Sequence, residues 1–174
     1  AGVNAAPLTL AIDPGQRSIV INTPAVMAAG KYVVRAELVP RGGRAPVQVS
    51  TPVDVLAGDA AVGNAALAYR RGPSTGLAYV PTADARFRRT ERLRIEVPIA
   101  AEHVAGNGRL LTRDGQPLPL TVTYQVRRDE RVSKWYAVGE VILSPLAPGE
   151  YVLELTLTAS GSTAPVAYGF RIIP

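Results

Sequence analysis

Apolar and polar residues alternate with a period of two along this chain, and this pattern most limits how its 174 residues can fold. In residues 151–158 a tyrosine and three leucines alternate with other side chains, and residues 118–127 show the same pattern. Successive side chains of a β-strand point to opposite faces, so both segments are predicted to be strands with one buried face. Turn-forming pairs such as Asp114 and Gly115 lie between such segments. We therefore expect an all-β chain built as an antiparallel β-sandwich.

A segment near the N-terminus recurs near the C-terminus at a constant offset. A Gly-x-Tyr motif followed by an alternating strand begins at Gly30 and again at Gly149, 119 residues later. The same offset aligns the Ala-Pro-Val of residues 45–47 with that of residues 164–166. We infer two related β modules, each of which ends in the same strand–turn–strand unit.

The tyrosine of each motif stands at the start of the penultimate strand of its module, as Tyr32 or Tyr151. This position resembles the tyrosine corner of immunoglobulin-like sandwiches, in which the hydroxyl ties the preceding corner to the sheet. A tyrosine that merely fills the core is the alternative. The resemblance implies tandem immunoglobulin-like antiparallel β-sandwiches. Residues 1–58 would form a short or incomplete β module, and residues 59–174 a whole sandwich.

The short module lacks the opening half of its partner. Three explanations stay open: the chain is cut from a longer one, the short module is a minimal sheet docked on the second domain, or another molecule supplies the missing strand. A half-sandwich leaves backbone groups unpaired along an edge and apolar side chains in water, and proteins that use such an edge polymerise by strand addition. The candidate donor is the N-terminal segment, in which Leu8, Leu10 and Ile12 alternate with other residues. The expected function is a non-catalytic structural or assembly module whose partner is another protein, including copies of itself.

A basic segment over residues 86–98 carries the second functional signal. We expect one extended strand in which four arginines share a face. They are Arg86, Arg88, Arg92 and Arg94. Such a row can hold sulfate, phosphate or carboxylate groups through forked hydrogen bonds, which makes an anionic polysaccharide the alternative partner. The competing interpretation is a solvated face balanced by Glu96 and by cross-strand acids such as Glu140 or Glu154.

Composition narrows the remaining function classes. Lys and Arg number 19 against 14 Asp and Glu, and the net charge of +5 favours anionic partners. Nucleic acid is not expected, because no exposed aromatic platforms are interleaved with the basic residues. No apolar run is long enough for a membrane span. With no cysteine and one histidine, disulfide scaffolds, zinc sites and Ser-His triads within this chain are nearly excluded, so we expect no cofactor and no enzyme activity.

Residues 69–98 and 146–152 carry a resemblance to a known family. They are similar to the immunoglobulin-like β modules that lie C-terminal to von Willebrand factor A-related domains in large secreted bacterial proteins. The likeness covers residues 67–174 and rests on turn and strand residues. It implies an extracellular or cell-envelope location and a spacer or adhesive role. The A domain is not in this chain, so no metal-binding adhesion residues can be assigned.

Overall fold

The computed structural model describes residues 8–12, 18–21, 27–40, 42–55, 62–63, 65–100, 102–159 and 161–174. The elements in these residues are β-strands and one short 3-10 helix, η1 (Pro73–Thr75). The chain divides into two compact units. The larger consists of Ala1–Asn22 and Ala61–Pro174, and the smaller is Thr23–Ala60.

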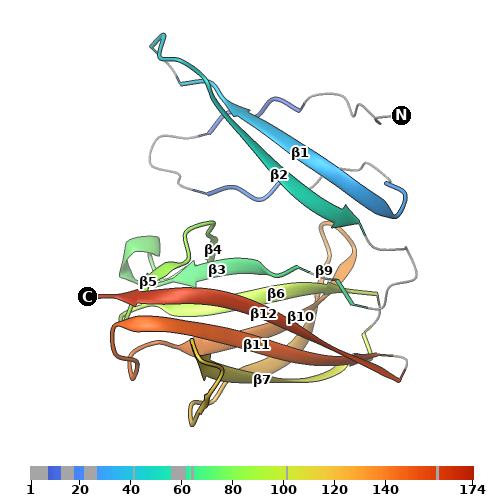
Figure 1. Ribbon diagram of the computed structural model, residues 1–174, viewed down its shortest axis with the longest axis vertical. Helices are drawn as coiled ribbons and strands as arrows, with labels where there is room; N and C mark the ends of the chain where they lie inside the picture. The colour runs from blue at the N-terminus through green and yellow to red at the C-terminus, as the bar shows by residue number, and fades with distance from the viewer. Residues whose placement is uncertain are drawn as a thin grey trace. The chain divides into compact units, whose positions relative to one another are not determined.

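The larger unit is a sandwich of two sheets (Figure 1). The first sheet has the order β4-β3-β6-β10-β9, and the second has the order β5-β12-β11-β7-β8. The strands of the first sheet are β3 (Leu67–Arg71), β4 (Val80–Pro81), β6 (Arg92–Ile99), β9 (Thr123–Asp129) and β10 (Lys134–Ile142). Those of the second are β5 (Arg86–Arg88), β7 (Ala105–Thr112), β8 (Pro117–Leu118), β11 (Gly149–Ala159) and β12 (Ser162–Ile173). Neighbours pair antiparallel except β5 and β12, so the predicted all-β class and sandwich are confirmed.

The strand order is that of an immunoglobulin-like sandwich. When the seven main strands are lettered A to G in chain order, the sheet β3-β6-β10-β9 reads A-B-E-D. The sheet β12-β11-β7 then reads G-F-C, as in that fold. Tyr151 then stands at the start of the F-type strand, where that fold places its tyrosine corner. Leu153, two residues later, occupies the position of a disulfide cysteine in antibody domains and is completely buried here.

The core lies between the two sheets. Alternate residues of the central strands β6 and β11 have no solvent exposure: Leu93, Ile95, Val97, Leu153, Leu155 and Leu157. Phe87 and Phe170 meet edge to face, with their ring centroids 5.9 Å apart. Full burial of one such side chain contributes about 1.5–3 kcal/mol, so the period-two face predicted for residues 151–158 anchors the sandwich.

Both tyrosines of the repeated motif make the same hydrogen bond. The hydroxyl of Tyr151 donates to the carbonyl of Ala147 at 2.9 Å, and that of Tyr32 donates to the carbonyl of Ala28 at 2.9 Å. Both bonds span four residues, and they are separated by the offset of the repeat. The hydroxyl therefore ties the corner to the strand in both copies, as the tyrosine-corner interpretation predicts.

The smaller unit contains a two-stranded antiparallel hairpin of β1 (Gly30–Leu38) and β2 (Val47–Val55). It corresponds to β11 and β12, because Tyr32 stands opposite Val53 as Tyr151 stands opposite Phe170. This pairing makes the ungapped alignment wrong by two residues in the second strand: Val49, not Val47, takes the place of Val166. The connection after β1 is longer than that after β11, and a shift of two residues keeps every side chain on its face.

Replacing Tyr151 by phenylalanine removes the corner hydrogen bond and keeps the ring. We expect the free energy of unfolding of the sandwich to fall by about 1 kcal/mol. Urea denaturation followed by fluorescence of Trp135, the single tryptophan, measures it. Tyr32→Phe is the matched control and should leave this transition unchanged. A Tyr151→Phe sandwich as stable as wild type would show that the ring alone matters.

Candidate functional site

The two faces of the hairpin differ in charge. Directly paired residues of an antiparallel ladder lie on the same face. Four pairs define the apolar face, which holds no charged residue: Tyr32–Val53, Val34–Thr51, Ala36–Val49 and Leu38–Val47. The opposite face carries all four charged residues of the two strands: Lys31, Arg35, Glu37 and Asp54. The hairpin is thus amphipathic in the same sense as one sheet of a sandwich.

The apolar face is exposed, whereas its counterpart in the larger unit is buried. Val34 is 53% exposed, and Leu153, its equivalent 119 residues later, is 0% exposed. Leu38 is 52% exposed, and its equivalent Leu157 is 0% exposed. In the sandwich, these leucines belong to one core with apolar residues of β6 and β10. Among the described residues, the hairpin therefore presents the inner face of a sandwich without a sheet that covers it.

The outer edges of the hairpin are also unpaired within the described residues. The equivalent edge of β11 is paired with β7 from Tyr151–Thr112 to Thr158–Ala105. On the other side, β2 contains Pro52, which has no N–H to donate and sits in sheets with its nitrogen toward a free edge. The outer edge of β1 consequently has the more complete set of free backbone donors and acceptors.

The candidate donor residues are accessible. Leu8, Leu10 and Ile12 lie outside every described strand, with 61%, 44% and 42% of their surfaces exposed. Downstream of them, the backbone N–H of Ala83 donates to the hydroxyl of Ser18 at 3.0 Å, a contact within the larger unit.

The four arginines of the basic segment do not lie on one strand, so the expected continuous strand over residues 86–98 is wrong. β5 ends at Arg88 in the second sheet, and β6 begins at Arg92 in the first. Glu91 causes the break: its carboxylate accepts from the backbone N–H of Arg88 at 2.7 Å, and its own N–H donates to the carbonyl of Arg88 at 3.0 Å. This turn carries the chain from one sheet to the other and separates Arg86 and Arg88 from Arg92 and Arg94.

Arg92 and Arg94 are neutralised by a cross-strand acid. Their guanidinium groups both reach Glu140 at 3.3 Å, as the competing interpretation expects. The guanidinium of Arg94 also lies 3.6 Å from the ring centroid of Tyr79. Burial acts to raise the pKa of Glu140, but the nearby Tyr79 hydroxyl and the hydrogen bonds from Arg94 and Arg92 outweigh it, so that the pKa lies below its ordinary value.

A second ion pair occupies the same outer face. Arg127 forks onto the carboxylate of Glu96 with bonds of 3.0 and 2.6 Å, and Glu96 is buried. Burial, followed by the nearby charge of Glu96, raises the pKa of Tyr69 to about 12. On the other sheet, Glu154 binds Arg109 at 2.7 Å. Glu96, Glu140 and Glu154 thus all have arginine partners. An anion that bound to the arginines of the first sheet would have to displace the carboxylates of Glu96 or Glu140.

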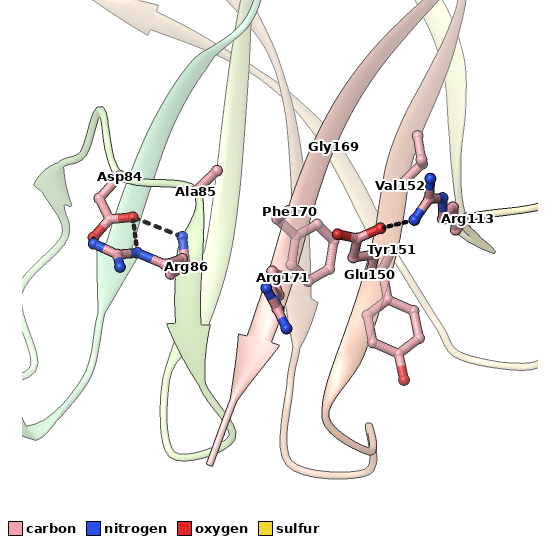
Figure 2. A pocket seen from close by; sticks show the side chains of 10 residues that line it. All are labelled: Asp84, Ala85, Arg86, Arg113, Glu150, Tyr151, Val152, Gly169, Phe170 and Arg171. Carbon is pink, nitrogen blue, oxygen red and sulfur yellow. Dashed lines mark hydrogen bonds and ion pairs between the residues drawn. The ribbon is translucent and has the colours of Figure 1, made fainter.

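Of the other two arginines, Arg86 borders a shallow hollow of about 380 Å³ (Figure 2). Arg88 lies beside this hollow. Arg86, at its rim, is bound to Asp84 at 3.0 Å, while Arg88 lies next along β5. Arg171 stands directly opposite Arg86 on β12, and no ion pair or side-chain hydrogen bond joins it to any described residue. On its other side, Arg171 stands opposite Glu150 of β11, which binds Arg113 at 2.8 Å, so an anion would bind on the β5 side of Arg171, between the two like charges. Sequence reasoning missed Arg171, because the pairing of β5 with β12 is not local.

Binding sites of other classes are not evident in the described residues. No group of three His, Cys, Asp or Glu residues there could hold a metal ion. No helix in that part of the chain is long and apolar enough to cross a membrane. The two candidate interaction surfaces in the described residues are the apolar face with its edge and the basic hollow.

Glu140→Gln tests the ion-pair network on the first sheet. A carboxylate whose pKa is lowered in the folded state stabilises the protein above its ordinary pKa of 4.5, and this contribution is lost as the pH falls through the lower, folded value. We expect the variant to be about 1 kcal/mol less stable than wild type at pH 7, and the difference to shrink as the pH falls below 4.5 through the folded-state pKa, in thermal unfolding at a series of pH values. A stability difference that did not depend on pH would contradict this assignment.

Comparison with known proteins supplies no relative. No protein-family model matches the chain. No curated protein matches it significantly. The resemblance of residues 67–174 to modules beside von Willebrand factor A-related domains stays a prediction, and substrates or partners have to be inferred from the residues themselves.

Proposed function

We propose that this chain is a non-catalytic structural and assembly module of a bacterial surface or secreted protein, built from tandem immunoglobulin-like units of which the first is completed by another molecule. The observation that carries the proposal is the exposed apolar face of the hairpin: Val34 and Leu38 are about half exposed, whereas their equivalents Leu153 and Leu157 are fully buried. An extracellular spacer that self-associates through β-strand complementation accounts for this face and for the free edge beside it.

The energetics favour covering this face. Burying a valine or leucine side chain contributes about 1.5–3 kcal/mol, and the apolar face presents several of them in register. Its lack of charge means that a covering sheet needs no ion pairs and pays no penalty for burying a charge. Exposed apolar surfaces of this kind are typical of protein interaction sites.

A lysine on the apolar face should abolish assembly. We expect the wild-type mass in light scattering to grow beyond 18.4 kDa with concentration, and Val34→Lys to remain monomeric because a charge cannot enter the apolar contact. Val33→Lys is the matched control, since this neighbouring valine is exposed on the charged face, and it should assemble as wild type does. A wild type that stays monomeric over a hundredfold range of concentration would overturn the proposal.

A second candidate function is binding of an anionic polysaccharide. The observation that favours it is Arg171, which stands beside Arg86 in the β5–β12 pair and has no ion pair with a carboxylate of the described residues. With Arg88 alongside, three guanidinium groups stand on the outer face of β5 and β12. Asp84 holds Arg86 as Glu140 holds Arg92 and Arg94, so Arg88 and Arg171 are the members of this cluster without a carboxylate partner among the described residues, and they replace the predicted row of four.

Arg171→Gln tests this second candidate with dextran sulfate as the probe. Loss of one charge-assisted contact should weaken binding roughly tenfold at low salt, and added salt should weaken the wild type progressively. Arg131→Gln removes an exposed arginine in the turn after β9 and is the matched control. Equal affinity for both variants would show that only net charge attracts the polymer.

A further inference from the structure

The larger unit contains a template for a strand beside β1. There, β7 runs antiparallel along the outer edge of β11, and the inner-face pairs include Leu110–Leu153 and Gly108–Leu155. The repeat offset carries Leu153 to Val34 and Leu155 to Ala36. A strand added to β1 in the same way would lie antiparallel to it, with its inner side chains opposite Val34, Ala36 and Leu38.

The template also sets the chemistry of that strand. Its alternate residues must be apolar to extend the apolar face, and the residues between them would lie opposite Arg35 and Glu37, which have opposite charges. An uncharged segment avoids repelling either one. In the sandwich, the large Leu155 of β11 stands opposite the small Gly108 of β7. The equivalent of Leu155 in the hairpin is the small Ala36, so the side chain added opposite Ala36 can be large.

Residues 8–12 meet these requirements. They carry no charge, and Leu8, Leu10 and Ile12 alternate with Thr9 and Ala11. The template fixes the direction and the faces of the added strand, and we choose the register that sets Ile12 opposite Val34, Leu10 opposite Ala36 and Leu8 opposite Leu38, because it pairs the large Leu10 with the small Ala36. Leu10 opposite Ala36 again pairs a large residue with a small one, as Leu155 and Gly108 do. Here the large residue is on the added strand and the small one is on β1.

From these matches we infer that the outer edge of β1 is a strand-acceptor site and that its occupant is residues 8–12 of a second copy of this chain. The inference rests on the proposed assembly function and specifies its partner, direction and register. Within one chain, residues 8–12 belong to the larger unit, and the hairpin ladder contains β1 and β2 alone in the described residues. Donation from each copy to the next is a head-to-tail contact, which forms rings or open chains.

Disulfide trapping between two separately purified single variants tests the inference. The chain has no cysteine, so Leu10→Cys mixed with Ala36→Cys can form a single type of mixed disulfide. Side chains directly opposite in an antiparallel pair have Cβ atoms about 4.5–5.5 Å apart, close to disulfide geometry. With oxidised glutathione as the oxidant, we expect a disulfide dimer in non-reducing gel electrophoresis of the mixture that exceeds the dimer formed by either variant alone. Leu10→Cys mixed with Arg35→Cys is the control, because Arg35 points to the other face, and it should give little product.

The outcomes separate this inference from the proposed function. Wild-type assembly in light scattering without a mixed disulfide would overturn the donor assignment and leave the assembly function intact. A double variant, Leu10→Cys with Ala36→Cys in one chain, that closes only as a monomer would show pairing within a single copy and would also overturn it. A wild type that never assembles would remove both.

As a second measurement, Leu10→Lys should prevent assembly while the unfolding of the sandwich, followed by the fluorescence of Trp135, stays unchanged.

Discussion

An apolar sheet face has to be covered, and most of this structure follows from that requirement. In the larger unit, the inner leucines of β11 lose their contact with water, because apolar residues of β6 and β10 belong to the same core. The same strand pair recurs in the smaller unit with valines and a leucine that keep about half of their surface in water. One chain thus contains a covered and an uncovered version of the same hairpin, and the difference between them is the physical basis of the proposed assembly.

The tyrosine corner explains how the hairpin keeps its form in both surroundings. Its hydrogen bond joins residues only four positions apart, so it depends on local sequence and not on the opposite sheet. Gly-x-Tyr and the alternating strand after it therefore specify the same corner, whether or not a core is present. Local interactions of this kind can hold an acceptor strand ready, and the apolar contact then adds the free energy of association.

The sequence predicts the elements that depend on local pattern and misses those that depend on distant partners. Alternation reveals the buried leucines of β11, and the repeat reveals both corner tyrosines. Neither reveals that Glu91 folds back on Arg88 to break the basic segment, although Arg89 and Glu91 interrupt the apolar alternation between Phe87 and Leu93. The two-residue shift of β2 follows from its longer connection, and the pairing of Arg171 with Arg86 follows from the parallel contact of β5 with β12. The alternating N-terminal segment was visible from sequence, but its acceptor edge required the ladder of β7 and β11.

Charge and apolar contact have unequal weight on this surface. Exposed ion pairs contribute about 0–1 kcal/mol each, and many arginines of the sandwich already have carboxylate partners on their own sheets. A polyanion at the basic hollow therefore gains from a few guanidinium groups whose attraction salt screens. In the proposed assembly, the apolar face would lose its contact with water whatever the ionic strength, and each valine or leucine so buried would contribute more than such an ion pair. At physiological salt the balance favours assembly through the hairpin over recognition through net charge.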